Sequence, residues 1–189
     1  RSGPGYEYED SAIIAFAHTN KGHWNLCNIP VLPVSGTNKT DNKFSSRFSH
    51  DKESASPGYY QVYLEDYGIN VQLTSTLRCG YHQYDFSDAR GRKILFDLAK
   101  ANNRVRSWAI EQAGNSAVQG FQDVGNDKIY FYASFSSPIG KLEKVSENTR
   151  EGRAIVHLKD DNKKKVELKI GLSFVSVENA KQNLEKEIG

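Results

Sequence analysis

Short stretches in which apolar and polar residues alternate recur along this chain, and they restrict the folds that it can adopt. Residues 60–65 and 69–77 alternate in this way, and so do residues 128–135 and 165–170. Side chains on a strand point to opposite faces with a period of two, so each stretch predicts a strand with one buried face. Further strands are predicted at residues 11–16, 29–34, 80–86, 93–98, 105–112, 117–121 and 154–158.

Turn-forming residues separate these predicted strands. Asp66-Tyr-Gly68, Gly125-Asn-Asp127 and Asp160-Asp-Asn162 are sequences that favour chain reversal. About a dozen short strands at this spacing are typical of a sandwich or a barrel. A parallel α/β fold would need helical crossovers, and the intervals between the strands are too short for them. We therefore expect an all-β domain, built as a large antiparallel β-sandwich.

A helical pattern is found at the end of the chain. Val177, Ala180, Leu184 and Ile188 fall on one face at steps of three and four, and Ser176 can cap the first turn. A helix of about 12 residues is marginal in isolation, so it needs a surface to pack against. The pattern fits both a connector into a following domain and a helix folded back on its own sheet.

The composition excludes several classes of protein. Hydrophobic residues make up 38% and charged residues 25% of 189 residues, which fits a single domain with a core and not a disordered chain. No apolar run approaches the roughly 20 residues of a transmembrane helix, and the formal net charge of +2 does not indicate nucleic acid as a partner. Two cysteines, Cys27 and Cys79, can form one disulfide or remain two buried thiols.

The most unusual stretch lies between the first two predicted strands, at residues 18–28. It combines two imidazoles, three carboxamides and an indole within eleven residues. Carboxamides and imidazoles can pair with sugar hydroxyls, and an aromatic face can stack on a pyranose ring. A structural alternative stays open, in which Trp24 is a core anchor and His18 a hydrogen-bonded histidine at the end of a strand.

Metal and hydrolase chemistry find little support in the residues. His18, His23 and Cys27 have a spacing that zinc sites use, but the second pair of ligands that usually accompanies it is missing. Hydrolysis of a glycoside requires two carboxyl groups that face the scissile bond. The acidic candidates form no pair that the sequence can assign: Asp51, Glu53, Glu65, Asp66 and Asp97. We therefore expect no catalytic residue and no metal ligand in this chain.

An ordered series of motifs resembles the N-terminal domain of glycoside hydrolase family 92. An apolar strand ends at His-Thr in Ala12-Ile-Ile-Ala-Phe-Ala-His-Thr19, and Asn28-Ile-Pro-Val-Leu-Pro33 resembles the strand that follows the family's variable loop. The longest match runs from Phe48 to Ile69 and continues from Leu73 to His82. Shorter matches follow at residues 118–120, 128–132 and 171–180, so that the resemblance covers nearly the whole chain.

The resemblance implies one part of a two-domain enzyme. Family 92 members are calcium-dependent, inverting exo-α-mannosidases, mostly bacterial and exported. Their N-terminal domain is a supersandwich like that of galactose mutarotase, and a helical linker joins it to an (α/α)₆ barrel. The barrel supplies the general acid, the general base and the calcium ligands. Residues 1–175 would then be the sandwich and residues 176–189 the linker, and calcium would be bound outside this chain.

The resemblance also implies a role for the loop at residues 18–28. It matches the family's pocket-forming loop, which makes His23, Trp24 and Asn25 the expected sugar contacts, with His18 and Asn28 as their supports. The expected partners are α-mannoside glycans, with α-1,2 linkages preferred, and the enzyme's own catalytic domain. Residues 20–27 read Asn-Lys-Gly-His-Trp-Asn-Leu-Cys, where many relatives have a Ser-Gly-Thr-Gly-Cys type of stretch. This departure concerns the specificity of the enzyme for one type of glycosidic linkage.

Relatives also carry an earlier segment that includes a Pro-Phe-Gly-Met-type strand. A sandwich without its first strand or strands would leave a sheet edge uncovered, and such edges favour association. We therefore expect self-association or one unpaired edge. Two alternatives to the mannosidase role stay open: a stand-alone carbohydrate-binding module, and a purely structural sandwich in which Trp24 is buried against the core.

Overall fold

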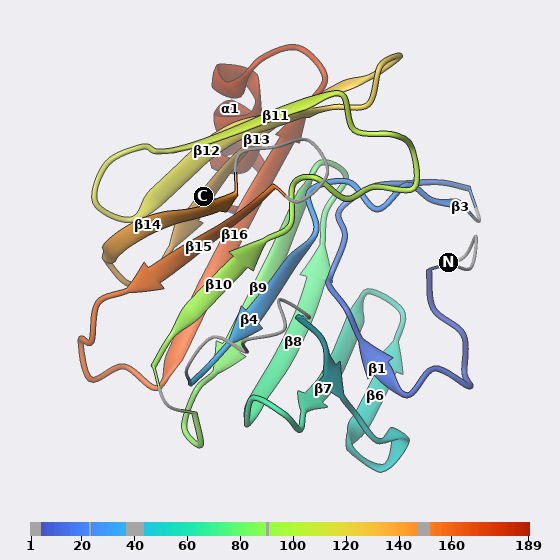
Figure 1. Cartoon of the computed structure of the whole chain (residues 1–189), viewed down its shortest axis with the longest axis vertical. Coiled ribbons are helices and arrows are strands. Elements are labelled where there is room, and N and C mark those ends of the chain that lie inside the picture. The colour runs from blue at the N-terminus through green and yellow to red at the C-terminus, as the bar shows by residue number, and fades with distance from the viewer. Residues whose placement is uncertain (1–4, 23, 37–43, 90, 147–151) are drawn as a thin grey trace.

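Two antiparallel sheets face each other in the computed structural model, which describes residues 5–22, 24–36, 44–89, 91–146 and 152–189 (Figure 1). The larger sheet has eight strands, in the order β11 (Ser107–Gln112), β12 (Ala117–Asp123), β13 (Lys128–Phe135), β16 (Lys165–Ser173), β9 (Cys79–Asp85), β8 (Ile69–Ser75), β7 (Tyr59–Leu64) and β6 (Glu53–Ser56). The smaller sheet has four, in the order β14 (Ile139–Ser146), β15 (Arg153–Leu158), β10 (Lys93–Phe96) and β4 (Val31–Val34).

The remaining elements are short. Strand β1 (Ala12–Ile13) pairs with β5 (Ser46–Arg47), and β2 (Asn20–Lys21) forms a hairpin with β3 (Trp24–Asn25). A 3₁₀ turn, η1 (His50–Lys52), precedes β6, and the helix α1 (Val177–Ile188) follows β16. None of the helices in the described residues is long and apolar enough to cross a membrane.

The core lies between the two sheets. Leu32, Ile94 and Val156 of the smaller sheet are fully buried, as are Tyr84 and Phe131 of the larger one. Phe96 on β10 and Phe131 on β13 stack across the interface, with ring centroids 5.8 Å apart. Burial of these side chains is the main favourable contribution to folding, at about 1.5–3 kcal/mol for a large apolar side chain. The predicted all-β antiparallel sandwich is confirmed.

The helix α1 covers the outer face of the larger sheet, on β16, β13 and β9. Ala180 and Leu184 are buried there against Gly171, where a Cβ atom would lie 2.2 Å from the carbonyl oxygen of Ala180. The Ser176 hydroxyl caps the helix by accepting a hydrogen bond from the amide of Asn179 at 3.1 Å. The helix is therefore folded back on its own sheet. Its role as a linker at residues 176–189 stays a prediction.

The expected self-association would use the two edge strands of the larger sheet. Strands β11 and β6 are its outermost strands, and within the described residues each pairs with one neighbouring strand. Edge strands of this kind can add a strand from another chain. Self-association through them stays a prediction.

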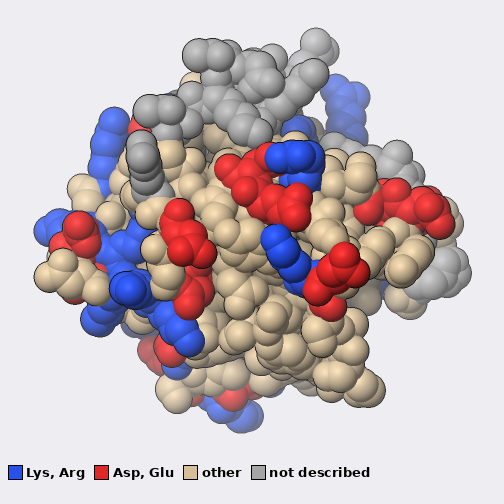
Figure 2. Space-filling model, turned by 90° about the horizontal axis from the view of Figure 1, so that it is seen from below, with Lys and Arg blue, Asp and Glu red and all other residues tan. Residues whose placement is uncertain are grey.

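On the face shown in Figure 2, acidic and basic side chains are interspersed and neither sign covers the surface continuously.

Candidate functional site

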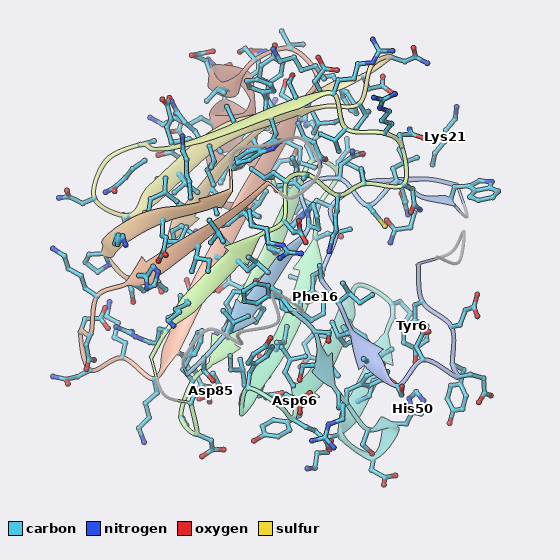
Figure 3. All side chains as sticks on the ribbon, viewed as in Figure 1. Tyr6, Phe16, Lys21, His50, Asp66 and Asp85 are labelled. Atoms are coloured by element: carbon cyan, nitrogen blue, oxygen red, sulfur yellow. The ribbon has the colours of Figure 1, made fainter. Side chains whose placement is uncertain are left out.

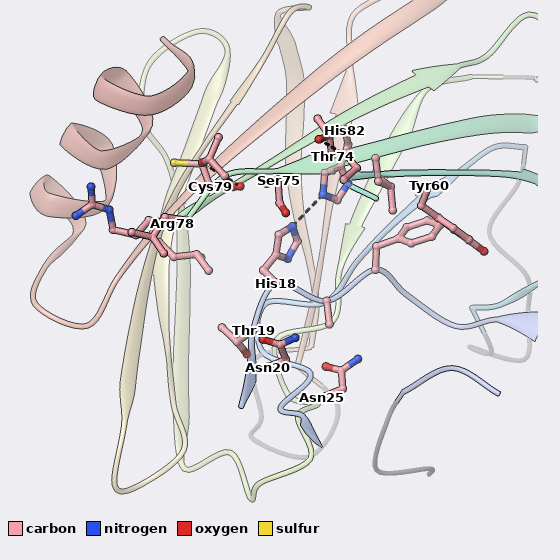
Figure 4. Close-up of a pocket in the computed structure, with 18 of the residues that line it drawn as sticks. His18, Thr19, Asn20, Asn25, Tyr60, Thr74, Ser75, Arg78, Cys79 and His82 are labelled. Atoms are coloured by element: carbon pink, nitrogen blue, oxygen red, sulfur yellow. Dashed lines mark hydrogen bonds between the residues drawn. The ribbon is translucent and has the colours of Figure 1, made fainter. Parts of the chain in front are cut away.

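A cavity of about 740 Å³ opens where the β2–β3 hairpin and the β8–β9 turn meet at one end of the sandwich (Figure 4). Its floor comes from inward-facing residues of the larger sheet, and its roof from the segment that leads into the hairpin. Polar groups predominate among the residues that the figure labels: His18, Thr19, Asn20, Asn25, Tyr60, Thr74, Ser75, Arg78, Cys79 and His82. A concave site with a few convergent polar groups is the usual form of a ligand pocket.

The hairpin stands out from the sandwich as a small two-stranded ribbon. Asn20 pairs with Asn25 and Lys21 with Trp24, and Gly22 supplies the positive φ of +60° that the tight turn requires. The side chain of Trp24 is 56% exposed. A large indole held at the surface by a hairpin is a suitable platform for a sugar ring.

The structure brings together only some of the residues predicted for the site. His18 and Asn25 line the cavity, whereas Trp24 lies on the hairpin beside it and is not among the lining residues. Asn28 is buried, and its carboxamide oxygen accepts a hydrogen bond from the Thr19 hydroxyl at 2.7 Å, so it contacts the base of the loop from inside. His23 lies outside the described residues. The roles of these five residues in sugar binding stay predictions.

A buried glutamine on β12 holds the base of this loop. The Gln122 side-chain oxygen accepts hydrogen bonds from the Asn28 carboxamide at 3.0 Å and from the Ile29 amide at 3.2 Å. Its amide group donates to the carbonyl oxygens of Leu98 at 2.8 Å and Lys100 at 2.9 Å. All the hydrogen-bonding capacity of the carboxamide is therefore used. The inward position of Gln122 could not be predicted from the sequence, because a lone glutamine in an alternating strand gives no sign that it faces inward.

These bonds hold the backbone in an uncommon conformation. Cys27 and Ile29 have positive φ values of 55° and 49°. Positive φ is a genuine outlier for a β-branched residue such as isoleucine, because its Cβ substituents clash with the backbone. Ile29 is fully buried and both its amide and its carbonyl group are hydrogen-bonded, which is what keeps the strained turn in place.

Two stacked histidines form the inner wall of the cavity. The His18 Nδ1–H donates to the carbonyl oxygen of Ile29 at 2.6 Å, which leaves its Nε2 as an acceptor. The Nε2 atoms of His18 and His82 are 3.1 Å apart, so His82 donates there, and its Nδ1 accepts from the Tyr84 hydroxyl at 2.7 Å. Gly80 leaves room for this arrangement, since a Cβ atom would lie 2.9 Å from the His18 ring. All four ring nitrogens are used, and both rings are neutral.

This pair predicts a loss of stability in mild acid. Burial lowers the pKa of His18 to about 4. Burial, together with repulsion from His18 once that ring is protonated, lowers the pKa of His82. A histidine whose pKa is depressed in the folded state stabilises the fold above pH 6.5, and this contribution is lost as the pH falls toward 4. For His18 alone the loss amounts to about 3 kcal/mol. NMR titration of the ring protons checks this, and a His18 that titrates near pH 6.5 would contradict it.

The half-buried His50 provides an internal comparison for that titration. The Glu53 carboxylate beside it and the carbonyl oxygen of Tyr8 raise the pKa of His50. Its contribution has the opposite sign, being present below pH 6.5 and lost as the pH rises above its folded pKa. The two residues should therefore titrate on opposite sides of pH 6.5 in the same sample.

The helix α1 fixes the opposite wall of the cavity. The Glu187 carboxylate in its last turn accepts hydrogen bonds from the Thr76 hydroxyl at 2.5 Å and from the Arg78 amide at 3.0 Å. The Arg78 Nε lies 2.6 Å from the same carboxylate. The bond from Thr76 and those from Arg78 lower the pKa of Glu187 to about 2, in spite of its partial burial. Thr76 and Arg78 both line the cavity.

Thiols and carboxylates are the potentially reactive groups to consider at this cavity. Cys27 and Cys79 form no disulfide, and burial raises the pKa of the Cys79 thiol to about 11, so it is not an activated nucleophile. The residues that line the cavity include no aspartate or glutamate in the described part of the chain. Within the same ranges, no three His, Cys, Asp or Glu side chains converge as metal ligands would. The binding of calcium outside this chain stays a prediction.

Comparisons with known proteins agree with this architecture. The model of the glycosyl hydrolase family 92 N-terminal domain matches residues 1–173. The structure of the family GH92 alpha-mannosidase BT3965 from Bacteroides thetaiotaomicron superposes with a TM-score of 0.85 at 25% identity, covering 99% of this chain and 30% of that one. The GH92 glycosyl hydrolase ccman5 gives 0.79 at 25% identity, with 100% and 30% covered.

A third structure supports the fold alone. The family GH92 inverting mannosidase BT2199 from Bacteroides thetaiotaomicron VPI-5482 gives a TM-score of 0.79 at 20% identity, covering 97% of this chain and 27% of that one. Comparison with curated proteins finds no match. The chain spans about 30% of the length of these solved structures. With a family model that covers residues 1–173, the chain belongs to glycoside hydrolase family 92 and corresponds to its N-terminal domain.

Proposed function

We propose that this domain forms one wall of the pocket in which an exo-acting, inverting α-mannosidase binds the terminal sugar of an α-mannoside. The preferred linkage is α-1,2. The general acid, the general base and the calcium ligands come from a catalytic domain outside this chain. The whole enzyme is exported, to the periplasm, the cell surface or the medium.

One observation carries this proposal: the β2–β3 hairpin presents an exposed indole beside a polar cavity of about 740 Å³. Asn25 on the hairpin and Thr74 on β8 border that cavity from two sides. Amide and hydroxyl groups can each donate and accept, as recognition of vicinal sugar hydroxyls requires. The neutral imidazole of His18 adds no charge to the cavity wall, which suits an uncharged hexose.

The lack of carboxylates at the cavity supports the division of labour between two domains. Both catalytic carboxyl groups of a glycosidase must flank the scissile bond, at about 6.5–9.5 Å from each other in an inverting enzyme. No such pair borders this cavity in the described residues. The solved family members are more than three times as long as this chain, so their additional residues have room for these groups.

The test is Trp24→Ala in the full-length protein that contains this domain. Loss of the indole platform should lower kcat/KM for α-1,2-mannobiose about fivefold, since an aromatic contact contributes on the order of 1 kcal/mol. The melting temperature should stay unchanged, because the side chain is 56% exposed. Unchanged kinetics in a folded variant would overturn the proposal.

A stand-alone carbohydrate-binding module is the second candidate. It is favoured by the lining of the cavity from two sides, to which the β2–β3 hairpin and the β8–β9 turn both contribute. It predicts that the isolated domain binds mannobiose, whereas half of a pocket should bind too weakly for calorimetry to detect. The purely structural alternative requires Trp24 to be buried against the core, and its 56% exposure contradicts that requirement.

A further inference from the structure

A second cavity, of about 590 Å³, lies next to the first one. The two cavities share Phe16, Ala17, Asn25, Tyr60 and Leu73 as lining residues. The two cavities are therefore neighbours on the same side of the sandwich, with these five residues in common.

The second cavity has its own set of polar and aromatic groups. Tyr6 and Tyr8 come from the N-terminal segment, and His50, Glu53 and Ser54 come from η1 and β6. Figure 3 shows the labelled Tyr6 and His50 near each other, on the side of the molecule that also carries the hairpin with Lys21.

Glu53 organises this cluster. Its carboxylate accepts hydrogen bonds from the hydroxyl groups of Tyr6 at 3.0 Å and Tyr60 at 2.5 Å, and from Nδ1 of His50 at 2.6 Å. Burial alone would raise the pKa of Glu53, but these three bonds hold it below its ordinary value. Because Tyr6 and Tyr60 donate to Glu53, the lone pairs of both hydroxyl oxygens remain available to hydroxyl donors of a ligand.

His50 holds an exposed aromatic ring in a fixed position. Its Nδ1 lies within hydrogen-bonding distance of the Glu53 carboxylate, and its Nε2 is 2.7 Å from the carbonyl oxygen of Tyr8. Because both partners are acceptors, both nitrogens donate and the ring is an imidazolium. The ring of Tyr8 stacks on it with centroids 4.2 Å apart and planes 4° from parallel. Phe48 contacts the same imidazolium edge-on at 5.3 Å. Tyr8 is thus immobilised although 68% of it is exposed.

We propose that this second cavity is a carbohydrate subsite that binds a neutral hexose further along the same glycan, with the ring of Tyr8 as its stacking platform. A preorganised aromatic ring offers contact area without losing side-chain freedom on binding. The imidazolium and the carboxylate of the cluster neutralise each other, which favours an uncharged sugar over an acidic one. This inference rests on the proposed function, because the first cavity must hold the terminal mannose and the sugar next to it for the rest of the chain to extend into the second.

The test compares substrate lengths in the full-length protein, with kcat/KM measured for α-1,2-linked mannobiose and mannotetraose. Tyr8→Ala should lower kcat/KM for the tetraose about fivefold and leave that for the biose unchanged, given the usual strength of an aromatic contact. Tyr8→Phe keeps the ring and should behave as the wild type. Equal effects of Tyr8→Ala on both substrates, or no effect on either, in a variant with an unchanged melting temperature, would overturn the subsite.

The outcomes separate the two proposals. If Trp24→Ala impairs both substrates while Tyr8→Ala impairs neither, the proposed function stands and the second subsite is wrong. If the wild type hydrolyses no α-mannoside, the proposed function is wrong and the subsite falls with it. Selective loss with the tetraose in Tyr8→Ala alone supports both.

Discussion

Gln122→Leu should lower the free energy of unfolding of this domain by about 4 kcal/mol, because it leaves several buried hydrogen-bonding groups without a partner at similar side-chain volume. The affected groups are the Asn28 carboxamide, the Ile29 amide and the carbonyl oxygens of Leu98 and Lys100. The strained turn at Ile29 would lose one of its two polar anchors. Urea denaturation gives the stability, and amide hydrogen exchange at Ile29 gives the local effect, which should be much faster exchange.

Gln119→Leu is the matched control for that variant. Gln119 lies on the same strand, but its side chain is partly exposed and donates to Glu111 at 2.8 Å on the surface. This substitution should change stability by less than about 0.5 kcal/mol. If both variants have the same stability as the wild type, the four hydrogen bonds of Gln122 do not stabilise the base of the loop as proposed.

Gly171→Ala should displace the helix α1 from the sheet. The added Cβ atom would lie 2.2 Å from the Ala180 carbonyl oxygen and 2.8 Å from Leu184, and backbone at such a distance must move. Overpacking of this kind lowers stability by about 3 kcal/mol. Since α1 is the one α-helix in the described residues, its release should appear in the circular dichroism at 222 nm as well as in the denaturation midpoint.

Gly140→Ala provides the comparison for Gly171→Ala. Gly140 lies in β14, is exposed, and would bring its Cβ atom no closer than 3.4 Å to the carbonyl oxygen of His157. The φ angle there is not positive, so alanine adopts it without strain. A Gly140→Ala variant as unstable as Gly171→Ala would show that the sheet resists any added methyl group, and that the contact with α1 is not the cause.

The strands of the sandwich were predictable where one face is buried and the other is not. Strand β13 alternates between partly exposed and buried residues along its whole length, so its pattern and its structure coincide. Strands β6 and β14 were missed, because both lie at a sheet edge and carry mostly polar or exposed residues. The pairing of β14 also contains two register shifts, which interrupt any simple alternation.

The prediction for residues 11–16 was too long. The structure has β1 at Ala12–Ile13 and an isolated bridge between Phe16 and Val31. An apolar stretch indicates burial, but the length of a strand depends on the partner that lies beside it. Here β5 offers only two residues for pairing.

The candidate site was predictable as a loop but not as a pocket. The density of imidazole, amide and indole groups singled out residues 18–28, and part of this segment lines the cavity. The opposite wall comes from residues about 50 positions further along the chain, at Thr74 and Arg78, and from Glu187 at its end. Side chains that meet only through the packing of the sheet leave no local pattern. For the same reason the contact between His18 and His82 could not be foreseen.

The β2–β3 hairpin is anchored at its root and exposed at its apex. Its fixing contacts lie at its root, at His18, Asn28 and Ile29, whereas Lys21 and Trp24 near its apex are exposed. Exposed positions accept replacement with little effect on folding. In the function proposed above, mutations at the apex would therefore change which glycan is recognised while the scaffold stays intact, so selectivity and foldability could evolve separately.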